Sequence, residues 1–246
     1  MRDMLNYNYV HMLFQEGFAV DAMDVIRARH SVRRYTGKPL EGPVLQALNA
    51  LIEEAREGSG LNIQLDLNNP NAFNVVARFG LIKGCSNCIV FPGTGHENDP
   101  EIGYWGQHIV LGAQELGLNT CWAMLCARKK LRAQLQPGQR IRVGVAVGYG
   151  AHNGKPRPTK EFEQLFTVEG ETVPSWFALA AEAAQLAPTG MNNQDFHLTL
   201  KSDGKTVVAQ AREGALRVLD LGIVRYNFER AAKQAGASWV WENRIL

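Results

Sequence analysis

Part of this chain occurs twice, and the repetition restricts the folds that it can adopt. Residues 59–64 (SGLNIQ) recur as residues 189–194 (TGMNNQ), each time after a helix-like stretch. In a second block, the pair Ile102 and Gly103 recurs as Leu221 and Gly222. Its further matches are Ala113 with Ala232, Gly117 with Gly236, and Trp122 with Trp241. Two blocks recurring in the same order predict a duplicated half-domain and not a solenoid, whose repeats are much shorter. A duplication also creates a seam between its halves, where pockets commonly form.

The composition is that of a globular chain. The 246 residues are 46% hydrophobic, enough to bury one large core or two fused small ones. The charged residues make up 20% and the formal net charge is +2, which indicates neither nucleic acid nor an acidic partner. The basic residues are unevenly distributed, however, and several fall close together: Arg27, Arg29, His30, Arg33, Arg34 and Lys38.

The first residues show no targeting signal. Residues 1–22 lack the basic start and long apolar core of a signal peptide, and no later segment approaches about 18 consecutive apolar residues. We therefore expect a cytoplasmic protein with no membrane contact. Residues 1–22 also lack a sustained period, so we interpret them as an N-terminal extension.

The four cysteines permit two interpretations. Cys85 with Cys88 and Cys121 with Cys126 could supply the ligands of a zinc site, although the second spacing is long for a ligand pair. Cys88 begins the apolar run CIVF, which is typical of a buried strand. Because cysteine often serves as a small core hydrophobe in a reducing compartment, we predict core cysteines and no metal site.

Hydrophobic periodicity divides the chain into alternating helices and strands. The predicted helices span 23–30, 42–58, 99–117, 127–135, 176–186 and 219–235. The predicted strands span 63–67, 75–82, 88–91, 120–124, 140–149, 197–200, 206–210 and 237–241. We divide the chain into an extension (1–22), a first half (23–150), a connector (151–173) and a second half (174–246). Such interleaving implies a mixed α/β or α+β layered fold.

A basic pentapeptide at 29–33 (RHSVR) follows the first predicted helix. Two guanidinium groups with a hydroxyl between them can hold a phosphate dianion, because each planar fork bonds two oxygens at once. A solvated basic turn is the alternative, and for this pentapeptide alone it is the commoner outcome. Lys155, Arg157 and Lys160 could add positive charge, and a solvated linker explains them equally well.

Two further segments could face a ligand. Residues 187–194 (APTGMNNQ) could aim backbone and side-chain amides at a ligand rich in carbonyl and ring nitrogen atoms, or could simply end a helix and turn. Residues 117–122 (GLNTCW) could bring backbone N–H groups to a bound ring. The alternative for them is a helix cap followed by a core strand that tryptophan anchors.

Taken together and in order, these segments resemble the flavin-dependent nitroreductase family, in particular the branch with two fused, diverged halves in one chain. The likeness extends from about residue 23 to residue 241. The run RHSVRRY at 29–35 resembles the family's opening phosphate motif, and 187–194 its Ala-Pro-Ser-x-x-Asn-x-Gln flavin loop. The run at 117–122 is similar to the Gly-Leu-Gly-Thr-Cys-Trp segment beside the isoalloxazine. The resemblance implies an α+β nitroreductase-like layered fold, internally duplicated with pseudo-two-fold symmetry, in which helices flank mixed sheets.

The resemblance also implies the cofactor site. In ordinary family members two subunits build each FMN site, so here the two halves of one chain would replace them, and a monomer is possible. The first half would contribute Arg29, His30, Ser31, Arg33, Thr120, Cys121 and Trp122. The second half would contribute Pro188, Thr189, Gly190, Met191, Asn192 and Gln194, with Asn192 bonding the ring or ribityl chain. Arg157 and Lys160 are implied as second-rank phosphate ligands.

Three departures from the family pattern are visible. Asp195 and Phe196 stand where the family has Pro-Trp, which alters the packing after the flavin loop. Asn119 replaces a glycine, and we expect this to be tolerated because asparagine accepts a positive φ. The second half has no Arg-x-Ser-x-Arg, since residues 159–163 occupy that place. We therefore expect one FMN per chain.

The function implied by the resemblance is that of an FMN-dependent oxidoreductase. Hydride would pass from NADH or NADPH through the flavin to an electron-poor acceptor of the nitroaromatic or quinone type. Because the cofactor carries such chemistry, we nominate no catalytic acid or base. Two alternatives stay open: a flavin-binding carrier or sensor without substantial turnover, and a nucleotide-phosphate binder unrelated to flavin.

Overall fold

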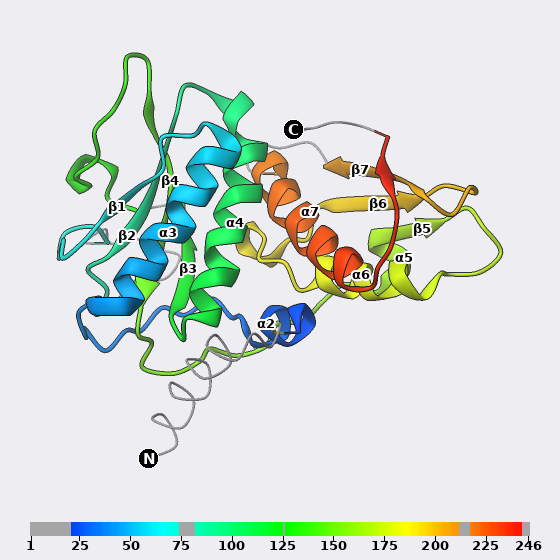
Figure 1. Ribbon diagram of the computed structural model, residues 1–246, viewed down its shortest axis with the longest axis horizontal. Helices are drawn as coiled ribbons and strands as arrows, with labels where there is room; N and C mark the ends of the chain where they lie inside the picture. The colour runs from blue at the N-terminus through cyan, green and yellow to red at the C-terminus, as the bar shows by residue number, and fades with distance from the viewer. Residues whose placement is uncertain (1–20, 74–81, 125, 212–216, 243–246) are drawn as a thin grey trace. The chain divides into compact units, whose positions relative to one another are not determined.

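The computed structural model describes residues 21–73, 82–124, 126–211 and 217–242, and these form two compact units (Figure 1). Within the described ranges, the first unit takes in 28–95 and 108–155. The second unit takes in 21–27, 96–107 and the chain from Pro156 onward. No helix in the described part of the chain is long and apolar enough to cross a bilayer.

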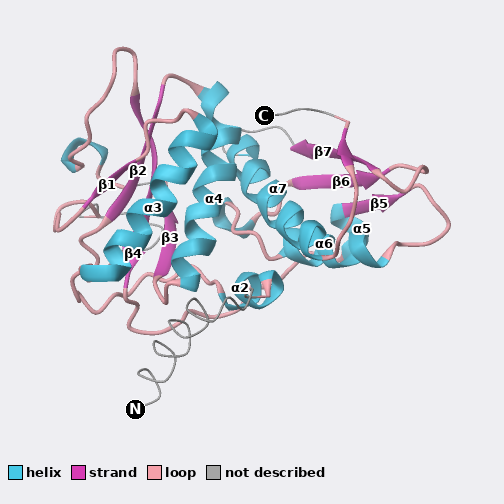
Figure 2. Ribbon diagram, viewed as in Figure 1, coloured by secondary structure: helices cyan, strands magenta, loops and turns pink. Residues whose placement is uncertain are grey.

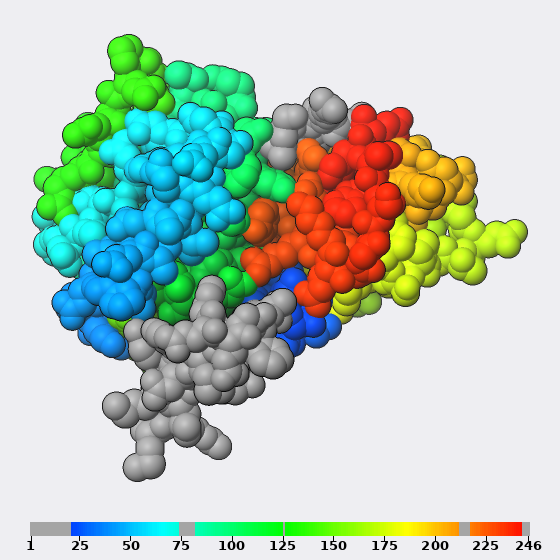
Figure 3. All heavy atoms as spheres, viewed as in Figure 1, coloured from blue at the N-terminus to red at the C-terminus, as the bar shows by residue number. Residues whose placement is uncertain are grey.

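The first unit is built on a four-stranded antiparallel sheet with strand order β1-β2-β4-β3. Its strands are β1 (Gln64–Asp66), β2 (Cys88–Gly93), β3 (Asn119–Ala123) and β4 (Arg140–Gly148). Every residue of β2 is buried, which explains why its sequence reads as a continuous apolar run. Figure 2 shows helix α3 (Gly42–Ser59) lying over this sheet, and in Figure 3 its outer face forms much of the visible surface of this unit.

The apolar period of α3 decides which of its faces is buried. Val44, Leu48, Ile52 and Ala55 recur at helical spacing and are all buried. Pro43 lies in the first turn, as the sequence predicts. The predicted stop at Gly58 is wrong by two residues, because the helix continues through Ser59. The backbone then turns left-handed at Gly60, whose φ is 70° and whose N–H donates to the carbonyl of Arg56.

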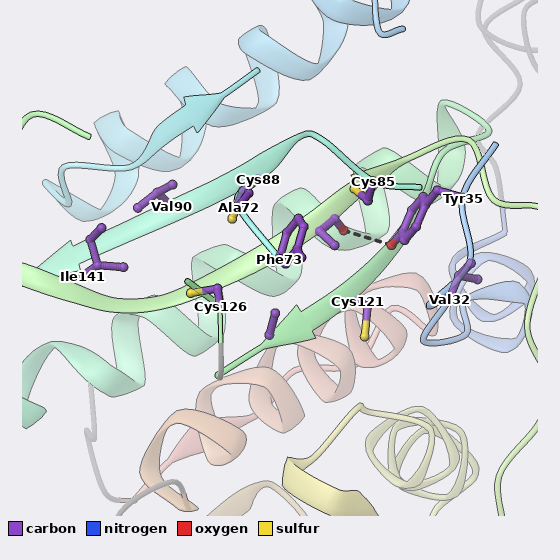
Figure 4. Close-up of a cluster of buried hydrophobic side chains, with 12 residues drawn as sticks. Val32, Tyr35, Ala72, Phe73, Cys85, Cys88, Val90, Cys121, Cys126 and Ile141 are labelled. Carbon is purple, nitrogen blue, oxygen red and sulfur yellow. Dashed lines mark hydrogen bonds between the residues drawn. The ribbon is translucent and has the colours of Figure 1, made fainter. Parts of the chain in front are cut away.

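The core of the first unit contains all four cysteines as free thiols (Figure 4). Burial raises the pKa of Cys85 to about 11, and it also raises the pKa of Cys88 and of Cys126. These thiols are therefore protonated and pack as small hydrophobic side chains, as predicted. Gly144 makes room for two of them, because a Cβ there would lie 2.7 Å from the Cys88 sulfur and 3.2 Å from the Cys126 sulfur.

The second unit is built on a mixed four-stranded sheet of order β5-β6-β7-β8. Its strands are β5 (Phe166–Val168), β6 (Phe196–Leu200), β7 (Thr206–Ala211) and β8 (Val240–Trp241). The two outer pairs are parallel and the central pair is antiparallel. Its helices are α2 (Ala22–Ala28, whose last residue falls in the first unit), α5 (Phe162–Leu165), α6 (Ser175–Gln185) and α7 (Arg217–Gln234). Helix α4 (Asp99–Glu115) contributes residues to both units. The α+β class with sheets flanked by helices, which the resemblance implied, is confirmed, although only the second of the two sheets is mixed.

Helix α7 crosses the first half of α4 at two glycines within the second unit. A Cβ on Gly103 would lie 2.0 Å from the Leu219 carbonyl oxygen, and a Cβ on Gly222 would lie 2.1 Å from the Pro100 carbonyl oxygen. Only glycine permits so close an approach of two helix backbones. Each glycine faces the carbonyl three residues before the other, so the contacts are reciprocal. These two glycines are the pair that the sequence repeat matches, although the duplication itself stays a prediction.

Some predicted elements do not form as expected, or lie outside the described residues. The helix predicted at 127–135 is wrong, because only a 3₁₀ turn at Arg128–Lys130 forms there. Asp66 instead accepts hydrogen bonds from the backbone and side chain of Arg132, and side-chain amides hold the backbone of Gln134. These long-range bonds replace the helical ones. The strand predicted at 75–82 lies almost entirely outside the described residues. The strand predicted at 237–241 forms only at its last two residues, as β8. The other predicted helices and strands are confirmed with modest shifts at their ends.

Candidate functional site

The basic segment 29–33 lies beside strand β3 in the first unit. Ser31 forms a parallel bridge with Thr120, and the Val32 N–H donates to the Thr120 carbonyl at 3.0 Å. Two of the three segments behind the family resemblance, far apart in sequence, are therefore hydrogen-bonded neighbours. Val32 is fully buried, whereas Ser31 and Arg33 remain partly exposed, so the hydroxyl and one guanidinium can reach a ligand.

The beginning of the predicted connector completes this cluster. The Thr36 N–H donates to the backbone carbonyl of Tyr149, and the Ala151 N–H donates to the backbone carbonyl of Arg34. Gly154, with a φ of 82°, packs directly on His30, because a Cβ there would lie 2.5 Å from that of the histidine. Residues 149–154 are thus fixed against the basic segment.

Asn119, which replaces the glycine of the family pattern, is accommodated for a reason other than a positive φ. Its φ is not positive, because it lies in β3 opposite Gly148. Its side-chain oxygen instead accepts the Gly150 N–H at 2.9 Å, and a Cβ on Gly150 would lie 2.5 Å from that oxygen. The expectation based on positive φ is therefore wrong, and the asparagine instead ties β3 to Gly150, directly before the connector.

The other predicted residues of the first unit differ in burial. Arg29 is only 8% exposed, and a guanidinium held so far from water requires compensating partners. Thr120 and Cys121 are buried with their side chains, so only their backbone could face a ligand. Trp122 is partly exposed, and its ring stacks on Phe91 with centroids 5.8 Å apart. Its indole therefore lies at the edge of the core.

The loop at 187–194 in the second unit has an unusual backbone. After Thr189 the chain forms a 3₁₀ turn at Gly190–Asn192, and Met191, Asn192 and Gln194 adopt φ values of 53°, 60° and 49°. Non-glycine residues in this region cost about 1–3 kcal/mol each, and such strain tends to concentrate at functional sites. Met191 is also 77% exposed.

A partly buried carboxyl anchors the loop. Asp220, in the first turn of α7, accepts the Gly190 N–H at 2.8 Å, and the Gln194 N–H donates to the Thr189 hydroxyl. Burial raises the pKa of Asp220 to about 6, against the lowering effect of the Gly190 bond, and the charge of Asp195 raises it further. Asp220 could not be recognised from its place in the sequence, because an acidic residue near the start of a helix usually serves only to interact with the helix dipole.

The departure at Asp195 takes part in an ion-pair cluster. Its carboxylate lies 3.5 Å from the Lys160 ammonium and 3.3 Å from the Arg217 guanidinium. Lys160 also donates to the Gln194 carbonyl at 3.1 Å, so this predicted phosphate ligand lies against the loop within the second unit. Arg157 is exposed. Asp195 thus offsets part of the charge that Lys160 could offer a phosphate.

Comparison with known proteins identifies the family. A family model described as putative TM nitroreductase matches residues 21–232, most of the chain. The chain belongs to this nitroreductase family. None of the curated proteins compared with the chain matches it significantly.

The chain is also similar to solved structures. A putative nitroreductase from Thermotoga maritima MSB8 matches with a TM-score of 0.66 at 18% identity, over 92% of this chain and 90% of that one. A putative nitroreductase from Desulfovibrio desulfuricans, solved in complex with FMN, matches with a TM-score of 0.48 at 20% identity, over 63% of this chain and 99% of that one. The first of these likenesses shows that the nitroreductase fold extends over nearly the whole chain.

Proposed function

We propose that this nitroreductase family member binds FMN and is an oxidoreductase that passes hydride from NADH or NADPH to an electron-poor acceptor of the nitroaromatic or quinone type. The observation that carries the proposal is the bridge between Ser31 and Thr120. It brings together a segment suited to phosphate and a segment that, in the family pattern, lies beside the flavin ring. The FMN named for two of the similar solved structures supports the same cofactor.

The phosphate of FMN would be held first by Arg29, Ser31 and Arg33. The partial exposure of Ser31 and Arg33 suits a dianion that is only partly removed from water. Permanently charged guanidinium groups are the strongest partners for such an anion, since each can form two parallel bonds to phosphate oxygens. Arg157 and Lys160 rank second, because Arg157 is exposed and Lys160 is already paired with Asp195.

Around the ring, backbone groups would contact the flavin more than side chains would. Thr120 and Cys121 would present peptide groups, and Trp122 would present its indole edge. Pro188, Thr189 and Gly190 would contact the cofactor from the strained loop. FMN supplies the redox chemistry when bound, and the protein binds and orients it. No side chain is therefore assigned as a catalytic acid or base.

A flavin carrier or sensor is the second candidate, and Asp195 favours it. Where the family pattern has proline, this carboxylate forms two ion pairs next to the loop. A change of charge at this position could alter how the reduced flavin is stabilised.

The visible absorbance spectrum of the purified protein tests the first step. We expect flavin bands, about one FMN per chain, and oxidation of NADH or NADPH when a quinone is added. Bound flavin without turnover would favour the carrier, and a protein that takes up no flavin when FMN is added would contradict both.

Substituting Arg157 and Lys160 together with serine tests the ranking of the phosphate ligands. We expect FMN affinity to fall less in this double variant than in Arg33→Ala. The reason is that Lys160 already forms an ion pair with Asp195, which offsets part of its charge. Fluorescence titration with FMN measures both variants. A larger loss in the double variant would reverse the ranking.

A further inference from the structure

The side-chain amide of Gln194 holds the backbone of the connector on both sides of Thr159. Its nitrogen donates to the Pro158 carbonyl at 3.3 Å, and its oxygen accepts the Lys160 N–H at 3.1 Å. Gln194 is 3% exposed, so water does not compete for these bonds. The Gln194 side chain thus satisfies one backbone carbonyl and one backbone N–H of the connector. A neighbouring β-strand would satisfy the same two kinds of group.

Two more amides strengthen this attachment. The Asn192 side chain donates to the same Pro158 carbonyl at 2.9 Å, and the Gln185 side chain donates to the Lys160 carbonyl at 3.0 Å. Lys160 in turn donates its ammonium to the Gln194 carbonyl. The backbone immediately after Arg157 is therefore fixed by side chains of the loop and of α6.

The earlier copy of the repeat forms the same arrangement in the first unit. Asn62 and Gln64 donate to the Gln134 carbonyl at 2.9 and 2.7 Å, and the Gln64 oxygen accepts the Gln134 N–H at 2.8 Å. In both copies, an asparagine and a glutamine two residues apart bind one distant carbonyl, and the glutamine also accepts a nearby N–H. We call this pair the amide clamp. What recurs in the sequence is therefore a device that holds a backbone segment.

The two clamps differ in what they hold. The clamp of Asn62 and Gln64 holds Gln134, in the irregular segment before β4. The clamp of Asn192 and Gln194 holds Pro158, directly after the exposed cation Arg157. Only the second clamp therefore adjoins a residue proposed to bind phosphate.

We propose that Asn192 and Gln194 are positioning residues for FMN, which act by fixing the connector that carries Arg157 and Lys160 and not by bonding the flavin ring. This inference rests on the proposed binding of FMN through its phosphate. Charge-assisted bonds to phosphate depend on direction and on short distances, so a connector released from the clamp would present its cations poorly. Releasing the connector should therefore remove only the part of the binding free energy that comes from the phosphate group of FMN.

Riboflavin is the probe that separates this role from a general one, because it has the ring and ribityl chain of FMN without the phosphate. For Gln194→Met we expect FMN affinity to fall on the order of ten-fold, the effect of one or two lost hydrogen bonds. Riboflavin affinity should stay near that of the wild type. Fluorescence titrations of the wild type and of Gln194→Met with each ligand give the change in affinity for FMN and for riboflavin.

Gln64→Met is the matched control, because it removes the same amide from the other clamp. We expect it to change neither affinity by more than about two-fold. If Gln194→Met does not fold, as judged by circular dichroism, the same titrations on Asn192→Ala decide the question, since that change removes a single donor.

Three results would overturn the inference. They are an unchanged FMN affinity in the Gln194 variant, an equal loss for FMN and riboflavin, and an effect of Gln64→Met on FMN as large as that of Gln194→Met. A wild-type protein that binds neither ligand would instead contradict the proposed function, so the two failures are distinguishable.

Discussion

Residues 59–64 and 189–194 carry the same amide clamp on different backbones. In the first copy Gly60 alone has a positive φ, and Ile63 is fully buried in the core. In the second copy, three non-glycine residues have a positive φ and Met191 projects into solvent. One copy is therefore a relaxed connection between a helix and a strand. The other is a strained loop that runs from exposed Met191 to buried Gln194, and such strain tends to concentrate at functional sites.

Arg33→Ala should have the largest effect, because only the first half carries the basic motif. Losing one charge-assisted phosphate contact costs about 1.5–3 kcal/mol, which weakens FMN binding roughly ten- to a hundred-fold. The folded protein should be isolated with little flavin. Its exposed neighbour gives the control, since Arg34→Ala should retain the cofactor. Wild-type FMN affinity in the Arg33 variant, or two flavins per chain, would contradict the prediction that only the first half supplies the phosphate-binding motif.

Asp220→Asn should reveal how the strained loop is anchored. Because the folded pKa of about 6 lies above the ordinary value of 3.8, the native state holds its proton more tightly than the unfolded chain. Stability from this group is therefore full at low pH and is lost as pH rises from about 4 to 6. Asparagine cannot ionise and can still accept the Gly190 N–H. The variant should be more stable than the wild type above pH 6, by about 1–3 kcal/mol.

Urea unfolding at pH 4.5 and pH 8 measures this difference. The difference in the free energy of unfolding between the variant and the wild type should be smaller at pH 4.5 than at pH 8. A gap that is independent of pH would show that the carboxyl does not titrate in this range.

Met191→Gly and Leu61→Gly compare the two backbones directly, since these residues occupy the same place in the repeat. Glycine should relieve strain at Met191, and we expect stability to be unchanged or to rise by up to about 1 kcal/mol. At partly buried Leu61, where φ is not positive, glycine should destabilise by about 1–2 kcal/mol. Thermal unfolding of both variants tests this, and equal losses would mean that the second copy is not strained.

The smallest expected effect is the difference in FMN affinity between Asn192→Ala and Asn62→Ala. Each removes one neutral hydrogen bond to a backbone carbonyl, worth about 0.5–1.5 kcal/mol. We expect only the Asn192 variant to weaken FMN, by roughly two- to ten-fold. Titration with FMN compares them. Similar effects would show that both copies contribute to cofactor binding.

The sequence predicted the regular elements where local forces dominate. Helix α3 and strand β4 follow from apolar residues at periods that match one buried face. The failure at 127–135 is instructive, because its residues favour a helix until Asp66, Asn62 and Gln64 bind the segment from far along the chain. No local pattern contains these partners.

The family, the repeat and the segments suited to a flavin site can be recognised from the order of the residues alone. The contacts of those residues, in contrast, are visible only in the folded chain. It pairs Ser31 with Thr120, places Asp220 beneath Gly190, and directs the amide of Gln194 onto the connector and not toward solvent. The reason is physical: hydrogen bonds and burial depend on distance in space, and the partners here lie tens of residues apart.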